Sequence, residues 1–346
     1  MGHRWGFLLI GWLCSLPVWA SNPWNEHTLP DEELKQYGKH YLVSLPDGYD
    51  QKAEKVWPVI VFLHGRGEWG DDLNILKKRG IPQYLNEGHK IPAIVIAPQS
   101  PQNQTWHPLF INAVMEDAAK QYHFDNSRIY LTGLSMGGIG SWNMAIAYPH
   151  RFAAIAPIAG CLMNDIAADS LGNDLAPPEQ LIPMLERIKD TPAWVFHGDR
   201  DFVVLTELGK RSASLFEQGG GKAKVTLYPM TDHDSWSQTY FDNPEFYSWL
   251  FAQNNHTSKW HERPITIEAH RYVGTYVDSN GSARAEVSTL KNGQISMRLL
   301  NENSEEELIP IDEKHFISSS FVYFEGDEKH MSTLVLPGIG TWTFKH

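Results

Sequence analysis

Residues 127–149 read Ser-Arg-Ile-Tyr-Leu-Thr-Gly-Leu-Ser-Met-Gly-Gly-Ile-Gly-Ser-Trp-Asn-Met-Ala-Ile-Ala-Tyr-Pro and are the most informative part of the chain. A β-branched and aromatic run at 128–132 predicts a strand, and helical spacing then continues until Pro149 stops it. Between them lies a G-x-S-x-G pentad. A strand, a tight turn and a helix in this order predict a nucleophile elbow, in which a strained turn exposes the hydroxyl of Ser135. The alternative, a glycine-rich loop that matches the pentad by chance, is disfavoured by the flanking strand and helix.

Length and composition set the outer bounds of the fold. A chain of 346 residues predicts one large domain and a smaller one rather than a single core. Apolar residues make up 42% of the chain, including 13 tryptophans, so extensive disorder is not expected. The formal net charge is −12, with acidic and basic residues interspersed. A polyanion would be repelled on average, so we expect no nucleic-acid partner.

The first twenty residues are typical of a secretory signal peptide. A positive charge in residues 1–4 precedes a short apolar run at 5–16, and Val18-Trp19-Ala20 offers a cleavage site after Ala20. A membrane anchor is the alternative, but the run is shorter than the roughly 20 residues that span a bilayer. We therefore expect a secreted or periplasmic protein without stable membrane insertion. Cleavage would remove Cys14 and leave Cys161 alone, so no internal disulfide is expected.

Strand-like and helix-like segments alternate over residues 21–253. Polar residues 21–36 are expected to cover the surface, and an edge strand follows at 41–45. Continuous apolar runs predict buried strands, and helical spacing predicts helices between them. The predicted strands are 59–63, 94–97, 128–132, 153–158, 194–197 and 225–228, and the predicted helices are 73–85, 109–122, 136–148, 179–188, 205–218 and 245–253. This order predicts a doubly wound, mostly parallel α/β sheet.

A serine at an elbow needs a base and an acid, which in open α/β sheets lie in loops at the carboxyl ends of later strands. The strand ending at His197 runs into a turn that carries two candidate acids, Asp199 and Asp201. The strand ending at 228 runs into a loop that carries His233. The resulting chain order of serine, aspartate and histidine is the order found in α/β-hydrolases.

Taken together, these motifs resemble a known family. They read HGRGEWGDD at 64–72, APQ at 97–99, RIYLTGLSMGG at 128–138, FHGDRD at 196–201, and DHDSW at 232–236 followed by NPEFYSWL at 243–250. In this order they are similar to the motifs of secreted esterases of the α/β-hydrolase superfamily. The closest group resembles the polyhydroxybutyrate-depolymerase, feruloyl-esterase and phospholipase/carboxylesterase-like enzymes. The resemblance covers about residues 41–251.

The resemblance assigns roles to individual residues. It implies that Ser135 is the nucleophile, Asp201 the acid and His233 the base, with the backbone N–H groups of Arg66 and Met136 forming the oxyanion hole. The activity that it implies is carboxylic ester hydrolysis through an acyl-enzyme, on a small-molecule or polymer-linked ester and without a cofactor.

Other polar and aromatic residues are given weaker roles. His64 and His197 precede glycine at strand ends and lack the spacing of a zinc site, so we expect structural roles and no metal. Glu68 is expected to hold the oxyanion turn by hydrogen bonds. Three tryptophans and one loop are further candidates: Trp69, Trp106 and Trp236 either line a pocket or pack in the core, and residues 161–178 are the candidate lid.

Helical periodicity ends after residue 253. Residues 254–265 are polar and predict a linker, and 266–346 contain short alternating segments separated by turns. The predicted strands are 272–277, 285–289, 294–300, 307–311, 321–324, 332–336 and 341–344. This small antiparallel β domain weakly resembles the lipocalin-like modules of some secreted serine hydrolases, mainly at 272–276. It either binds substrate or a surface, or stabilises the catalytic domain by packing.

Two alternative functions remain open on the sequence. A prolyl-oligopeptidase-like serine peptidase uses the same three residues, although no propeller repeat precedes the catalytic region. A non-catalytic binding protein on a hydrolase scaffold is the other alternative, but a binder needs none of the three. Chromogenic esters and peptide anilides distinguish the three functions.

Overall fold

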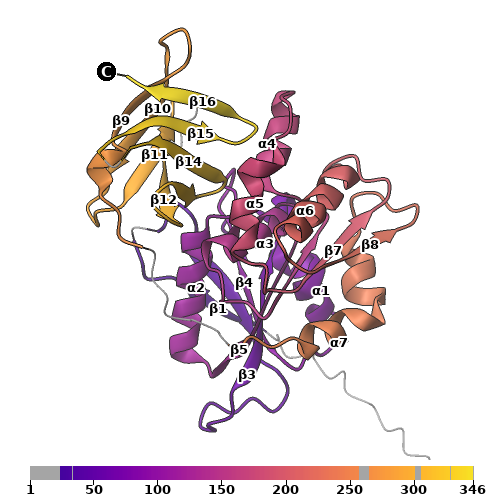
Figure 1. The fold of residues 1–346 in the computed structure, drawn as a ribbon. Helices are drawn as coiled ribbons and strands as arrows, with labels where there is room; N and C mark the ends of the chain where they lie inside the picture. The colour runs from indigo at the N-terminus through magenta and orange to yellow at the C-terminus, as the bar shows by residue number, and fades with distance from the viewer. Residues whose placement is uncertain (1–23, 33, 257–264, 301–304, 328, 346) are drawn as a thin grey trace, which may run out of the picture.

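The structure is a computed structural model that describes residues 24–32, 34–256, 265–300, 305–327 and 329–345. An eight-stranded sheet covered by helices is followed in the chain by a closed eight-stranded barrel (Figure 1). This confirms the predicted class, an α/β-hydrolase sheet with a C-terminal antiparallel β domain. The predicted signal peptide and most of the predicted linker lie outside the described residues.

The sheet follows the order β1-β2-β4-β3-β5-β6-β7-β8. The pairs β1·β2 and β2·β4 are antiparallel, and all the others are parallel. The strands are β1 (Trp24–Thr28), β2 (His40–Ser44), β3 (Trp57–Leu63), β4 (Ile94–Pro98), β5 (Phe124–Leu134), β6 (Ala154–Ile158), β7 (Ala193–Gly198) and β8 (Ala223–Tyr228). The expectation that 21–36 only covers the surface was wrong for β1. This edge strand is mostly exposed and polar, so it lacks the hydrophobic alternation that marks a strand.

Helices cover both faces of the sheet. One face carries α2 (Pro108–Gln121), α3 (Met136–Ala147), α5 (Pro178–Glu186) and α6 (Thr206–Gln218), and the other carries α1 (Gly80–Asn86) and α7 (Pro244–Ala252). Two predictions were wrong in detail. The helix expected at 73–85 is a 3₁₀ turn, Leu76–Lys78, followed by α1, because Arg79 is extended and Gly80 has a φ of 61°. The expected loop at 161–178 contains helix α4 (Met163–Leu171).

The C-terminal strands form a barrel in which each strand pairs antiparallel with the next, and β16 pairs with β9 to close it. They are β9 (Gly274–Val277), β10 (Ala283–Thr289), β11 (Ile295–Leu299), β12 (Glu305–Pro310), β13 (His315–Ile317), β14 (Phe321–Gly326), β15 (Met331–Leu336) and β16 (Gly340–Phe344). The sequence did not predict β13, since three residues are too few to show alternation.

The barrel packs directly against the helical face that carries α2 and α3 (Figure 1). Four buried barrel residues belong to the same hydrophobic cluster as these helices: Ile309, Ile311, Ile317 and Phe321. Asn164 of α4 adds a polar anchor, because its side chain accepts from the N–H of Phe321 at 2.9 Å and donates to the carbonyls of Phe321 and Pro337. The two parts of the molecule therefore share an apolar, hydrogen-bonded contact.

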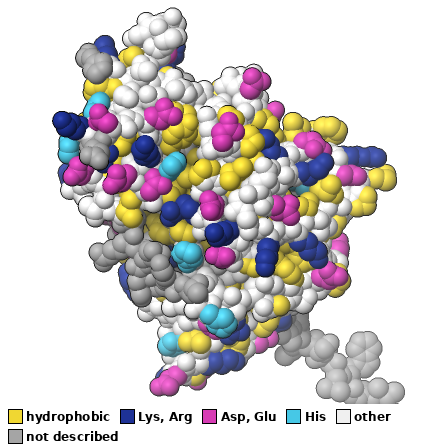
Figure 2. All heavy atoms as spheres, in the orientation of Figure 1, with side chains coloured by type: hydrophobic (Ala, Val, Ile, Leu, Met, Phe, Trp, Pro, Cys, Tyr) yellow, Lys and Arg dark blue, Asp and Glu magenta, His cyan; other side chains and the backbone are white. Residues whose placement is uncertain are grey.

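The surface agrees with the charge pattern of the sequence. On the face drawn in Figure 2, acidic, basic and hydrophobic side chains are interspersed, with no continuous basic stripe. Within the described residues, no helix combines the length and the apolar character needed to cross a membrane.

Candidate active site

The elbow at Ser135 has the strained geometry that its pentad predicts. Ser135 lies between β5 and α3 with φ 54° and ψ −118°, a conformation that L-residues rarely adopt. A Cβ added to Gly133 would lie 2.5 Å from the carbonyl oxygen of Gly137, and one added to Gly137 would lie 2.0 Å from that of Leu63. Glycine is therefore required on both sides of the serine.

The structure brings together the three residues predicted as a triad. His233 Nε2 lies 2.9 Å from Ser135 Oγ, and His233 Nδ1 lies 2.7 Å from Asp201 Oδ2. Each residue follows the carboxyl end of a different strand, β5, β7 or β8. Backbone hydrogen bonds from Asp199 to Tyr228 and from Arg200 to Thr231 tie the last two loops together. Asp201 is 3% exposed whereas Asp199 is exposed, so the geometry favours Asp201 as the partner of His233.

Asp201 is surrounded by donors. Its Oδ1 accepts the backbone N–H groups of Val203 and Val204 at 2.9 and 3.0 Å, and its Oδ2 lies 3.1 Å from His197 Nε2. Burial alone would raise the pKa of Asp201, but the hydrogen bonds from His197 and His233 hold that pKa well below its ordinary value. Asp201 is therefore ionised at physiological pH and presents a negative charge to His233.

His197 has a more specific place than the sequence suggested. Its ring is buried, and Nε2 lies 2.8 Å from the carbonyl of Val204 as well as close to Asp201. The expected structural role therefore includes holding the carboxylate. The four-residue spacing between His197 and Asp201 was the available signal, but spacing alone does not show that both side chains turn to the same side of a loop.

The turn after β3 lies against the elbow. A Cβ on Gly65 would lie 2.7 Å from the Leu134 side chain, and one on Gly137 would lie 2.8 Å from the carbonyl of His64. The backbone N–H of Gly65 donates to Glu68 Oε2 at 3.1 Å, and Glu68 Oε1 pairs with Arg79 at 2.9 Å. Glu68 therefore holds this turn, as expected. Burial raises the pKa of its carboxyl, although Arg79 opposes the shift.

His64 fixes the other side of the same turn. Its Nδ1 lies 2.6 Å from the carbonyl of Gly65, and its Nε2 accepts the N–H of Ser100 at 2.9 Å. Burial lowers the pKa of His64 to about 4, so the ring is neutral at physiological pH. This is the structural role expected from the sequence.

The two predicted oxyanion donors, Arg66 and Met136, belong to the turn after β3 and to the elbow. Met136 is the first residue of α3, where backbone N–H groups have no partner within the helix and the helix dipole favours a negative charge. Arg66 opens the 3₁₀ turn Arg66–Glu68, which the contacts above press against the elbow. Both residues therefore lie in segments that adjoin the contact between the β3 turn and the elbow.

The three candidate tryptophans differ in placement. Trp106 is buried; its indole N–H donates to the carbonyl of His64 at 3.0 Å, so it packs beneath the turn. Trp236 is buried with its ring edge-on to His233, at 5.2 Å between centroids. Trp69 is partly buried beneath the guanidinium of Arg66. Packing accounts for Trp106 and for Trp69, which packs against the hydrophobic core, whereas Trp236 lies against His233.

Within the described part of the chain, no three His, Cys, Asp or Glu side chains gather as metal ligands. Asp232 and Asp234, which flank His233, are both exposed, and Asp234 accepts from the backbone and hydroxyl of Ser237. Cys161 is a buried free thiol.

The chain is similar in sequence to a family of esterases and to individual members of known function. Residues 39–275 match the family model "Esterase", described as "Putative esterase". Feruloyl esterase C of Emericella nidulans is 32% identical over 37% of this chain and 48% of its own length. A protein of Aspergillus niger named "Probable feruloyl esterase C" is 32% identical over 59% of this chain and 70% of its own length. This chain thus spans about half the length of the Emericella nidulans protein.

One solved structure supports the fold. A thermostable esterase is 30% identical to this chain, with a TM-score of 0.52 over 67% of this chain and 63% of that protein.

Proposed function

Because the chain belongs to the esterase family, we propose that it is a serine carboxylic ester hydrolase. The observation that carries the proposal is the hydrogen-bonded series Ser135 Oγ, His233 and Asp201, at 2.9 and 2.7 Å, set at a strained elbow. A nucleophile in contact with a base that is oriented by a third group is the general signature of nucleophilic catalysis. This geometry supports the roles that we propose for the three residues.

In the proposed mechanism, His233 Nε2 takes the proton of Ser135 as Oγ attacks the ester carbonyl. The N–H groups of Arg66 and Met136 stabilise the oxyanion of the tetrahedral intermediate. His233 then protonates the departing alcohol, which leaves an acyl group on Ser135. Water, deprotonated by the same ring, attacks this acyl-enzyme and releases the acid. Asp201 stays ionised throughout and fixes the tautomer of His233.

The names of the relatives suggest where to look for a substrate. Two proteins that match this chain are named feruloyl esterases, so we propose esters of aromatic acids as the first class to compare with short acyl esters. The sequence of residues 1–20 supports secretion or a periplasmic location as part of the same proposal.

The test is Ser135→Ala. The side chain contributes chemistry rather than packing, so the variant should keep its circular dichroism spectrum and lose hydrolysis of p-nitrophenyl acetate. Covalent labelling by a fluorophosphonate should disappear with it. Retained labelling at another serine, or cleavage of peptide anilides in preference to esters, would overturn the proposal. A wild-type protein that hydrolyses neither class would favour a binding function.

A further inference from the structure

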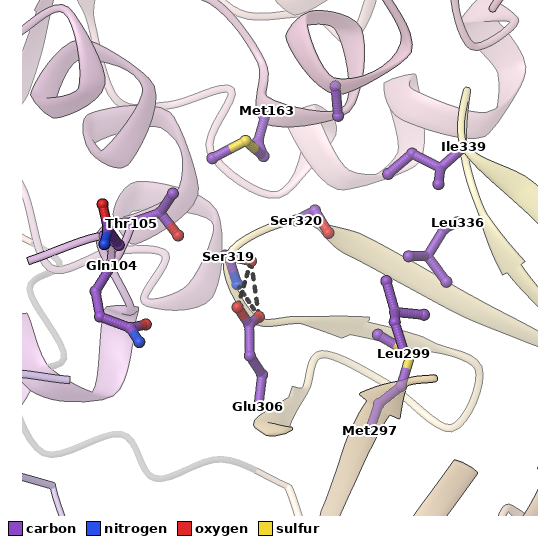
Figure 3. Close-up of a pocket in the computed structure, with 12 residues that line it drawn as sticks. Gln104, Thr105, Met163, Met297, Leu299, Glu306, Ser319, Ser320, Leu336 and Ile339 are labelled. Carbon is purple, nitrogen blue, oxygen red and sulfur yellow. Dashed lines mark hydrogen bonds between the residues drawn. The ribbon is translucent and has the colours of Figure 1, made fainter. Parts of the chain in front are cut away.

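A cavity of about 320 Å³ lies where the barrel meets helix α4 and the loop after β4 (Figure 3). The barrel contributes the end of β11, the start of β12 and the turns that follow β13 and β15. The catalytic part contributes the loop after β4 and the first turns of α4. No triad residue lines the cavity. Barrel mouths are common ligand sites, and this volume suits one small molecule or part of a longer one.

The lining has an apolar side and a polar side. The apolar side chains are Met163 and Ala167 of α4 and Met297, Leu299, Leu336 and Ile339 of the barrel. Across from the apolar side chains of the barrel, Figure 3 shows Gln104, Thr105 and Glu306. Glu306 is held in place by Ser319, whose N–H and hydroxyl lie 3.1 and 2.7 Å from one carboxylate oxygen. Among the described lining residues none is Lys or Arg and Glu306 is acidic, so the lining disfavours an anion and suits a group with an apolar body and hydroxyl donors.

Helix α3 connects the elbow to residues that border the lining of the cavity. A Cβ on Gly140 would lie 2.7 Å from Trp106, the residue after Thr105, and Asn143 donates to the carbonyl of Ser319. These helix positions lie five and eight residues beyond Ser135, or about 7.5 and 12 Å along the helix axis. Gly160, which precedes Met163 by three residues, contacts Gly138 in the first turn of α3. Along the helix axis alone the separation is therefore roughly 10 Å, so only an ester with a long remote portion could span Ser135 and the cavity.

We propose that this cavity is a subsite, built jointly by the barrel, helix α4 and the loop after β4, for the remote portion of an ester substrate. It takes an apolar group that bears hydroxyl donors and no negative charge, from either the acyl or the alcohol side. The proposal rests on the esterase function proposed above. It gives the barrel a part in selecting long substrates and none in the chemistry, since every proposed triad and oxyanion residue lies outside the barrel.

The experiment compares Leu299→Trp, which fills the cavity, with Leu300→Trp. Leu300 is the next residue, is 43% exposed and does not line the cavity, so it adds the same bulk outside. Three substrates are used: p-nitrophenyl acetate, the p-nitrophenyl ester of 10-hydroxydecanoic acid and an acetate ester of octyl glucoside. The second extends the acyl side and the third extends the alcohol side.

Leu299→Trp should raise KM at least tenfold for one of the two long esters and leave kcat/KM for p-nitrophenyl acetate within twofold. Leu300→Trp should match the wild type on all three. The long ester that is affected identifies the side of the substrate that enters the cavity. Met163→Trp fills the cavity from the catalytic side and replaces Leu299→Trp if that variant fails to fold.

Unchanged KM for both long esters, or an equal loss on all three substrates, would overturn the subsite. Failure of the esterase proposal is separate, because it would show as a wild-type protein without activity on any ester or as activity that survives Ser135→Ala.

Discussion

His197 and His233 contact the same oxygen, Oδ2 of Asp201, at 3.1 and 2.7 Å. The other carboxylate oxygen accepts two backbone N–H groups. Asp201 therefore has no freedom to rotate away from His233. We infer that the orientation of His233 toward Ser135 is set before substrate binds, which is the condition that electrostatic preorganisation requires.

Asp201→Asn should lower kcat by about 10⁴-fold, because an amide favours the wrong tautomer of His233. Asp199→Asn is the matched control, since Asp199 is exposed on the same turn, and it should stay within a few-fold of the wild type. Steady-state kinetics on p-nitrophenyl acetate measure both. A larger loss of kcat in Asp199→Asn than in Asp201→Asn would identify Asp199 as the acid.

His64 should make the folded state sensitive to mild acid. Its pKa is about 4 when folded and about 6.5 when unfolded, so the unfolded chain binds more protons between these values. The contribution of His64 to stability is complete above pH 6.5 and is lost as the pH falls toward 4, by up to about 3 kcal/mol. Urea unfolding of the wild type and His64→Gln at pH 4.5, 5.5, 6.5 and 7.5 measures this loss of stability. The wild type should lose more free energy of unfolding than the variant as the pH falls over this range. An equal loss in both proteins would contradict the prediction.

Gly137→Ala should prevent the elbow from closing. Its new Cβ would lie 2.0 Å from the backbone oxygen of Leu63, an atom that cannot move without displacing β3. Gly67→Ala is the control, because a Cβ there meets nothing within 4 Å. We expect the first variant to be insoluble or to lose at least ten degrees in Tm, and the second to keep the wild-type Tm. A soluble, fully active Gly137→Ala protein would show that the strand and helix can separate.

A chain that stops after residue 256 should keep its activity on small esters. Asn255 donates to the carbonyl of His150 and its N–H bonds to Ser127, so this end stays tied to the sheet. Removal of the barrel uncovers the surface that Ile309, Ile311, Ile317 and Phe321 cover, so Tm should fall. We expect kcat/KM for p-nitrophenyl acetate within a few-fold of the full chain. A folded truncation without this activity would place the barrel in the catalytic machinery.

Much of the fold was predictable because its signals are local. The apolar run at 59–63 and the pentad around Ser135 fix a buried strand and an elbow by side-chain chemistry alone. The polar edge strand β1 and the three-residue β13 were missed for the opposite reason. Their pairing is set by neighbouring strands, and neither sequence carries a pattern of its own.

The amino-acid sequence by itself determined the class of fold, the elbow and the loops that bring a serine, an aspartate and a histidine together, since each loop follows a strand end at a shared sheet edge. The choice of Asp201 over Asp199 came from the resemblance to a family. Only the tertiary structure decided that His197 shares the carboxylate of Asp201 and that Asn164 anchors the barrel. The same holds for the cavity that Met163 and Leu299 line together. These contacts join residues through loop conformation and domain packing, and a linear pattern of residue types records neither the direction of a side chain nor the face on which a barrel docks.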